Sequence, residues 1–174
     1  MRSLERLRHL YSHILKTCGL FAGLLTFAVM CLVVANVALR YSVNAPVAGT
    51  LELTEGALPL IVLLSLALTQ YNGGHIKVVL LTQNLPATPQ RILAVLAMLA
   101  GALLFGWAAY AGWLTTAKSI AIGEIERGSI RYPVWPIKAA VCFGMILLTI
   151  QFLLDAMLLA LGGTLNEPHA EEQI

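Results

Sequence analysis

The stretch TCGLFAGLLTFAVMCLVVANVAL, residues 17–39, decides the fold because it contains no charged side chain. An α-helix rises about 1.5 Å per residue, so roughly 20 apolar residues cross the hydrocarbon core of a bilayer, which is about 30 Å thick. This stretch is long enough to cross the core once. We therefore predict a transmembrane helix over residues 17–39.

Three further apolar stretches of similar length follow, at about residues 51–70, 92–117 and 137–161. Together with residues 17–39 they predict an all-α, polytopic membrane protein of four transmembrane helices joined by short connecting helices. Residues 1–163 would then form a single integral membrane domain. Residues 164–174 would form a short acidic tail.

The composition supports a membrane protein and excludes two other classes. Hydrophobic residues make up 59% of the 174 residues and charged residues only 11%, whereas a soluble domain carries about 25% charged residues. Such a chain cannot cover its apolar surface with polar side chains, which excludes a soluble globular domain. The net charge of +2 and the lack of a basic, aromatic-rich face exclude nucleic acid as a partner.

The residues before the first stretch divide between two faces of one helix. The apolar face comprises Leu4, Leu7, Tyr11, Ile14 and Leu15, and the other face Arg2, Arg6, His9, His13 and Lys16. This pattern predicts an N-terminal amphipathic interfacial helix that lies on the cytoplasmic surface against anionic membrane lipids. The alternative is a helix that packs on the cytoplasmic edge of a partner protein.

Arg2, Arg6, Arg8 and Lys16 precede the first span and predict the orientation, because positive charge stays on the cytoplasmic side. An even number of spans then places both the N- and the C-terminus in the cytoplasm. Lys77 and Arg91 agree with this orientation, whereas basic residues of the other two loops oppose it, and we let the first helix decide. Its apolar run exceeds the 7 to 15 residues of a cleavable signal core, which indicates an uncleaved anchor.

Several chemistries are excluded by the positions of the reactive residues. Haem ligation in a bilayer usually needs paired histidines, and all four histidines lie outside the predicted spans. Cys18, Cys31 and Cys142 are isolated within apolar stretches, as expected of small packing residues. The chain has no phosphate-binding glycine loop, nucleophile elbow or zinc-spaced motif. We expect no enzymatic activity, no metal and no cofactor.

Polar residues at membrane depth remain as candidates, because charge is costly there. Glu52 and Glu55 are three residues apart on one helix face, and Arg40 ends the preceding span at a level that we expect to be similar. The favoured interpretation is a structural ion pair. The alternatives are a contact with a partner subunit and an ion or proton site.

Other features predict helix packing. Pro59 is expected to kink or break the second span, and Asn36, Gln151 and Asp155 to hydrogen-bond across helices. Small-residue pairs predict close helix approach at Gly19 with Gly23, Ala97 with Gly101, Ala108 with Gly112 and Ala140 with Gly144. An aromatic belt at the outer interface is predicted from Trp107, Tyr110, Trp113, Tyr41, Tyr132 and Trp135.

The order of motifs along the chain resembles a known family. Asn36, Arg40 and Tyr41 close the first span; Glu52 and Glu55 open the second; then come Gly74, His75, Ile76, Leu85, Pro86 and Arg91, and finally Ser129, Tyr132, Pro133, Trp135 and Gly144. This order, from about residue 34 to residue 144, is similar to the small permease, or DctQ-type, subunit of tripartite ATP-independent periplasmic (TRAP) transporters.

The resemblance implies a division of labour in a bacterial inner membrane. A periplasmic solute-binding protein would deliver an organic acid, a carboxylate or sulfonate, and a large permease subunit would carry the substrate and sodium sites. The small subunit would act as a membrane scaffold for both. Its candidate structural or subunit-interface residues are Arg40, Tyr41, Glu52, Glu55, His75, Pro133 and Trp135.

Two other functions compete with this one. A stand-alone proton-coupled exporter working as a homodimer would use Glu52 or Glu55 as its proton carrier, but such exporters hold the carboxylate well inside the first span. A membrane anchor for a redox enzyme would need histidines that the spans lack. Co-purification separates the three, because a scaffold retains a much larger membrane subunit, an exporter only itself and an anchor a soluble enzyme.

Overall fold

The computed structural model describes residues 2–73 and 86–162, with side chains from Tyr11 onward except at residue 87. Within these ranges the chain forms helices α1 (Arg2–Val43), α2 (Thr50–Tyr71), α4 (Ala87–Ile122) and α5 (Trp135–Ala160), and no strand. Each is long and apolar enough to cross a membrane, which confirms the predicted fold class. The predicted connecting segment around His75 and the acidic tail lie outside the described residues.

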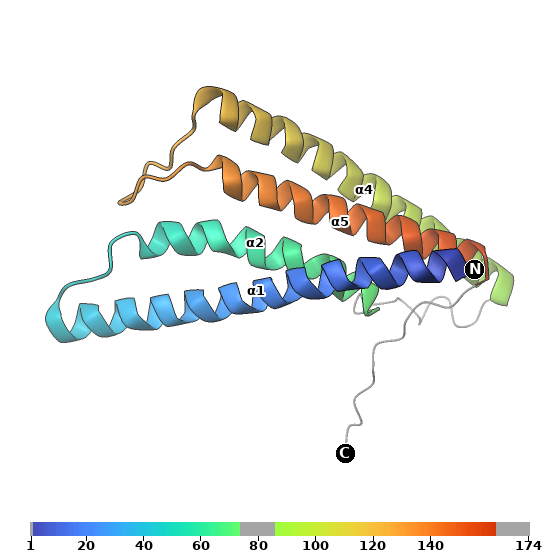
Figure 1. Cartoon of the computed structure of the whole chain (residues 1–174), viewed down its shortest axis with the longest axis horizontal. Coiled ribbons are helices and arrows are strands. Elements are labelled where there is room, and N and C mark those ends of the chain that lie inside the picture. Colours follow the sequence, from blue (N-terminus) through green and yellow to red (C-terminus); the bar gives the residue numbers. More distant parts are fainter. Residues whose placement is uncertain (1, 74–85, 163–174) are drawn as a thin grey trace, which may run out of the picture.

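The helices form an open layer of two antiparallel hairpins (Figure 1). The extensive contacts join α1 to α2, α2 to α5 and α5 to α4, so α2 and α5 are the inner helices and run parallel to each other. The hairpins approach each other at the end that holds the start of α1 and the end of α5, here called the convergent end. They diverge toward the loop end, where loops 44–49 and 123–134 lie.

The core lies at the convergent end, where α1 crosses onto the other hairpin. Tyr11 and Leu15 of α1 are buried with Ala67 of α2 and with Leu147 and Leu148 of α5. The Tyr11 hydroxyl donates a hydrogen bond to the carbonyl oxygen of Leu147. The structure therefore confirms a helix at the N-terminus but makes it continuous with the first span, and its side chains at Tyr11 and Leu15 contact protein rather than lipid headgroups.

Helix α1 packs on α2 through a narrow seam with alternating spacings of four and three residues. The seam comprises the buried or half-buried residues Tyr11, Leu15, Cys18, Ala22, Leu25, Val29, Leu32 and Asn36. This is the spacing of a coiled-coil contact. The remaining side chains between Leu20 and Val43 are almost all exposed and apolar, so they can only face lipid or another protein.

Small residues let neighbouring helices approach closely, as predicted, at one glycine of each of the four pairs, including Gly101 against Phe152 and Gly112 against Cys142. Gly144 of α5 lies against the backbone of Leu63 in α2, where an added Cβ atom would stand 2.9 Å from the Leu63 carbonyl oxygen. Gly19 lies against the Leu68 side chain, whereas nothing lies near Gly23. Cys142 is buried against Ala109 of α4, as expected of a small packing residue.

Helix α2 runs from Thr50 to Tyr71 through Pro59, so the second span is not broken there. Pro59 has no N–H group, so it cannot donate to the carbonyl oxygen of Glu55 four residues earlier. Both residues are exposed. The freed carbonyl group therefore belongs to an exposed stretch of the helix, close to a carboxylate.

Candidate functional site

A buried polar cluster joins the two hairpins at the convergent end. The amide nitrogen of Gln70 on α2 donates to Asp155 Oδ2, and that of Gln151 donates to Asp155 Oδ1, both at 2.9 Å. Gln70 Nε2 also lies 3.4 Å from the Met98 sulfur of α4. Asp155 is 1% exposed and Gln151 is fully buried. The predicted bond across helices is confirmed for Asp155, whereas Gln151 bonds within its own helix.

One acceptor of this cluster is left over. The side-chain oxygen of Gln151 is buried and has no hydrogen-bond partner among the described residues.

Asn36, the third residue for which a bond across helices was expected, instead accepts a hydrogen bond from the Val47 backbone N–H at 2.8 Å. Asn36 therefore holds the loop that follows its own helix rather than a neighbouring span.

Arg91 fastens the end of α5 to the start of α4. Its guanidinium group donates to the carbonyl oxygen of Leu159 at 2.5 Å and to that of Ala160 at 2.7 Å. The last carbonyl groups of a helix have no intrahelical donor and carry partial negative charge, so a cation there stabilises the helix end. Arg91 thereby closes the α4–α5 hairpin at the convergent end.

At the loop end, loop 123–134 folds back onto the start of α2. The half-buried carboxylate of Glu52 accepts a hydrogen bond from the Ser129 backbone N–H. The Tyr132 hydroxyl donates to the Glu52 carbonyl oxygen at 3.0 Å. Burial, and then the nearby carboxylates of Glu126, Glu52 and Glu55, raise the pKa of Tyr132. The loop thus bridges the hairpins where their helices diverge.

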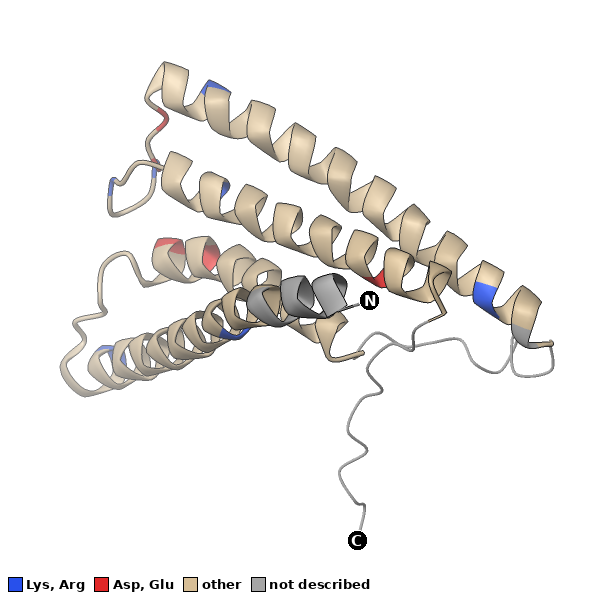
Figure 2. Ribbon diagram, turned by 45° about the vertical axis from the view of Figure 1, so that its right-hand side comes forward, with Lys and Arg blue, Asp and Glu red and all other residues tan. Residues whose placement is uncertain are grey.

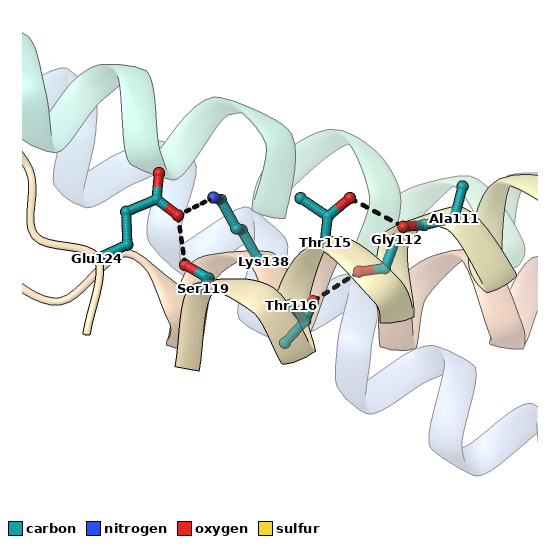
Figure 3. A network of polar contacts seen from close by, with 7 residues as sticks. All are labelled: Ala111, Gly112, Thr115, Thr116, Ser119, Glu124 and Lys138. Carbon is teal, nitrogen blue, oxygen red and sulfur yellow. Dashed lines mark hydrogen bonds and ion pairs between the residues drawn. The ribbon is translucent and has the colours of Figure 1, made fainter. Parts of the chain in front are cut away.

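A second polar network fixes the other side of the same loop (Figure 3). Glu124 accepts from Lys138 Nζ of α5 at 2.5 Å and from the Ser119 hydroxyl of α4 at 2.6 Å. The hydrogen bond from Lys138, followed by that from Ser119, lowers the pKa of the Glu124 carboxyl. Glu124 therefore joins the end of α4 to the start of α5.

The predicted ion pair of Arg40 with Glu52 or Glu55 is wrong. Among the described residues Arg40 forms no ion pair with either acid. The reason is the register of α1 against α2, which is fixed by Asn36 beside Val47 and by Gly19 beside Leu68.

Residues 19–36 of α1 therefore run beside residues 50–68 of α2, and Glu55 lies level with about Cys31. Arg40, nine residues further along α1, then stands roughly 13 Å beyond Glu55. That separation is too long for the expected pair.

The other candidate interface residues lie apart from one another. Tyr41 is 86% exposed at the tip of α1, and Trp135 is partly exposed at the start of α5. Pro133 forms a single antiparallel bridge with Ile125 inside loop 123–134. His75 lies outside the described residues.

The predicted aromatic belt does not form one level. Cys142 of α5 contacts Ala109 of α4, which places Trp135 level with about residue 116 to 118 in the antiparallel partner. Trp107 then lies roughly 15 Å deeper than Trp135 along the layer. Trp107, Tyr110 and Trp113 are nevertheless exposed along α4, so they face lipid or protein over much of its length.

Sequence reasoning missed four partners that build these contacts: Gln70, Ser129, Arg91 and Glu124. Two of these residues could have been noticed in the sequence. Gln70 is a polar residue at the end of an apolar run, and Glu124 is an acidic residue in the loop before Lys138, a basic residue at the start of a span. The contact made by Ser129 uses its backbone N–H group and carries no side-chain signal. Arg91 stands at the start of a span like many anchoring arginines, and its carbonyl partners are backbone groups as well.

No group of three His, Cys, Asp or Glu side chains within residues 2–73 and 86–162 is placed to hold a metal ion. Charged residues lie mainly near helix ends and in loops (Figure 2). The fold and these contacts define a polytopic membrane protein whose polar groups tie its own helices together.

Residues 29–162 match the family model described as the DctQ component of tripartite ATP-independent periplasmic transporters. The match covers most of the chain, which therefore belongs to the DctQ family, a family of transporter components. No curated protein matches the chain. Membership confirms the resemblance drawn from the motif order.

Proposed function

We propose that this chain is the scaffold subunit of a TRAP-type secondary transporter that imports an organic acid, a carboxylate or sulfonate, together with sodium. A large permease subunit carries the substrate and sodium sites, and a periplasmic solute-binding protein delivers the substrate. The chain lies in a bacterial inner membrane with both termini in the cytoplasm. Its loop end then faces the periplasm.

The observation that carries this proposal, beside family membership, is the open layer. In the most apolar 18-residue segment of α1 only 6% of the residues are buried, whereas in that of α5 39% are buried. The polar side chains buried at membrane depth bond to one another, as Gln70 and Gln151 do to Asp155, and the bond from Gln70 joins two helices of the layer. A layer with exposed outer helices and internally used polar groups fits a surface for other membrane subunits better than a solute pathway.

Co-purification and reconstitution test this proposal. The tagged chain, expressed with its neighbouring permease gene, is expected to retain a much larger membrane subunit through detergent purification. The purified chain alone should give no solute flux in vesicles, whereas the complete set of subunits should give sodium-driven uptake. Flux from the single chain, or retention of no other membrane protein, would remove the proposal.

The homodimeric exporter is tested by one substitution. Glu55→Gln keeps the shape of the side chain but cannot titrate, so a proton carrier would assemble normally and lose all transport. A scaffold carrying Glu55→Gln should keep substantial sodium-driven uptake once the other subunits are present. Normal assembly with complete loss of uptake would move the chemistry into this chain.

A further inference from the structure

Loop 123–134 is folded back on itself as a short hairpin. Ile125 and Pro133 form an antiparallel bridge. Next to this bridge the backbone N–H of Glu126 donates a hydrogen bond to the Tyr132 carbonyl oxygen at 2.9 Å. In such a pairing the residues of the two segments stand opposite each other, and successive side chains point to opposite faces.

The exposure of the side chains alternates along both segments as this pairing requires. The residues of the inward face are all partly buried: Glu124, Glu126, Tyr132 and Val134. The residues of the other face are all exposed: Ile125, Arg127, Arg131 and Pro133. We call these four exposed residues the outer loop face. The acidic residues of the loop therefore lie on its inward face, and its basic residues lie on the outer loop face.

The carboxylates of the inward face accept hydrogen bonds from this chain. Glu124 accepts from Lys138 and from the Ser119 hydroxyl. Glu126 Oε1 accepts the Arg127 backbone N–H at 3.1 Å. Neither guanidinium group of the outer loop face forms a hydrogen bond or an ion pair with the described residues. The loop thus uses its acidic groups internally and presents its cations outward.

The pairing also places the two arginines close together. Arg127 follows Glu126 and Arg131 precedes Tyr132, so the arginines stand opposite each other across a turn of three residues. Like charges directly opposite each other on one face are destabilising. Arginines in a short loop are also unfavourable on the side of the membrane away from the cytoplasm. A bound anion would offset both costs.

From this geometry we infer that the outer loop face binds an acidic surface of the periplasmic solute-binding protein, and that Arg127 and Arg131 bond its carboxylates. This inference rests on the proposed function, under which the loop end faces the periplasm and a soluble partner approaches from that side. A guanidinium group matches a carboxylate through two parallel hydrogen bonds, so a pair of arginines suits a cluster of acidic side chains.

The rest of the loop suits a protein partner as well. Loop 123–134 lies between the end of α4 and the start of α5, so its tip stands outside the apolar spans. Ile125 is 54% exposed on the same face as the arginines, and a protein surface can cover it together with them. The contacts of Glu52 and Glu124 already fix the loop, so little conformational freedom is lost when a partner binds.

Photo-crosslinking in the assembled transporter tests the face. A photoreactive amino acid replaces either Ile125 on the outer loop face or Ile120 on α4, which are 54% and 55% exposed. Position 125 is expected to give adducts with the binding protein, and position 120 few or none. Adducts from position 125 only with lipid, with the large permease or with a second copy of this chain would overturn the inference.

Charge reversal tests the chemistry of the partner. The complex of this chain with the large permease, in nanodiscs of zwitterionic lipid, is titrated with the binding protein at low and at high salt. Arg127→Glu/Arg131→Glu should weaken binding by about tenfold or more at low salt and remove most of its salt dependence, because salt screens attraction between exposed charges. Arg40→Glu, at an exposed cation of α1, is the control and should weaken binding much less.

A compensating change identifies the opposite charge. In the binding protein, replacing an acidic residue of the crosslinked surface by lysine should restore binding to Arg127→Glu/Arg131→Glu. Both arginines are exposed and make no side-chain contact that holds the fold, so the thermal unfolding midpoint of this variant should stay close to that of the wild type.

The two failures can be told apart. If the wild-type chain retains no permease, or the complete set of subunits gives no uptake, the proposed function fails. If the wild-type complex binds the binding protein and Arg127→Glu/Arg131→Glu binds it equally well, only the inference about the outer loop face is wrong. Equal losses in that variant and in Arg40→Glu would likewise count against a specific contact at this face.

Discussion

Gln70 on α2 donates a hydrogen bond to the buried carboxylate of Asp155 on α5 at 2.9 Å, and this bond ties the two hairpins together at their convergent end. Two other contacts among the described residues also join distant parts of the chain and can be tested by substitution. Arg91 holds the end of α5, and Glu52 holds loop 123–134 at the opposite end. Because the atoms of each contact are known, a substitution can remove each contact separately.

The buried cluster predicts a graded series of stabilities. Asp155→Ala removes the acceptor of both amide groups, and each buried donor left without an acceptor costs about 1–3 kcal/mol. Gln151→Leu should be milder than Gln70→Leu, since it also removes the buried oxygen of Gln151 that has no partner. Thermal unfolding of the detergent-purified protein measures the order.

Leu153→Ala, at an exposed position of the same helix, is the control for that series and should shift the midpoint little. The double variant Gln70→Leu/Asp155→Leu should recover part of the loss seen with Asp155→Ala, because donor and acceptor leave together. An Asp155→Ala protein as stable as the wild type would show that the cluster contributes nothing to the fold.

The contacts of Arg91 predict that its removal destabilises the C-terminal end of α5. Arg91→Ala removes the guanidinium donor from the carbonyl groups of Leu159 and Ala160 and leaves Leu159 only the Gly162 N–H, so the last turn should open more often. Hydrogen exchange of the peptides around residues 156–161 should become faster, by about tenfold. Arg91→Lys should lie between, since an ammonium group cannot reproduce the fork of donors. Lys118→Ala, on the same helix, should leave this region unchanged.

The Glu124 network predicts a dependence on pH. Lys138 and Ser119 hold the pKa of Glu124 below its ordinary value in the folded protein. The stabilisation is therefore present above the unfolded pKa, which is about 4.3, and is lost as the pH falls through the lower folded value. The wild type should exceed Glu124→Gln in unfolding midpoint at pH 7, and the difference should shrink below about pH 4. A constant difference across this range would contradict the assignment.

Topology is open to a direct test. If the basic N-terminus stays in the cytoplasm, reporter fusions after Asn72 and Thr164 should report the cytoplasm, and a fusion after Glu126 the periplasm. The Glu126 fusion matters most, because loop 123–134 carries the contacts that join the hairpins at the loop end. A periplasmic reporter at Thr164 would overturn the four-span topology, and the opposite pattern at all three sites would invert it.

The sequence was sufficient for the spans because charge-free length is a local property. The helix ends were harder to predict, since α4 continues to Ile122 although apolar character weakens at Lys118. Helix α1 likewise continues from the amphipathic N-terminal segment into the first span without a break. Hydropathy indicates which residues prefer lipid. It does not indicate where a helix ends, because that depends on the hydrogen bonds of the backbone at the helix terminus.

The site was only partly predictable, for a geometric reason. Arg40 and Glu55 were expected at one level because each stands at the end of an apolar run. In the structure loop 44–49 folds back along α1, with the Ala45 N–H on the Leu39 carbonyl oxygen and the Val47 N–H on Asn36. Because the loop folds back, α2 begins beside Asn36 of α1 and not beyond the end of α1. No pattern in the loop sequence gives this displacement.

The hydrogen bond between the Ser129 N–H and the Glu52 carboxylate predicts that removing this carboxylate makes loop 123–134 more accessible to protease. The carboxylate accepts a backbone N–H, and hydrogen bonds to charged groups contribute about 1.5–3 kcal/mol. Glu52→Ala should free the loop and raise the rate of trypsin cleavage after Arg127 and Arg131, both exposed, by about tenfold. Glu52→Gln keeps an acceptor oxygen and should give a smaller increase.

Three further variants make the result specific to this contact. Glu55→Ala, one turn further along α2, removes a carboxylate that the loop does not bind and should leave cleavage of the purified chain unchanged. Tyr132→Phe removes only the hydroxyl bond to the Glu52 carbonyl and should act weakly. Gly128→Ala should behave like Glu52→Ala, because an added Cβ atom would stand 2.2 Å from the Glu52 carboxylate oxygen and displace it. If Glu52→Ala and Gly128→Ala both left the cleavage rate unchanged, the bond between Glu52 and Ser129 would not be what holds the loop.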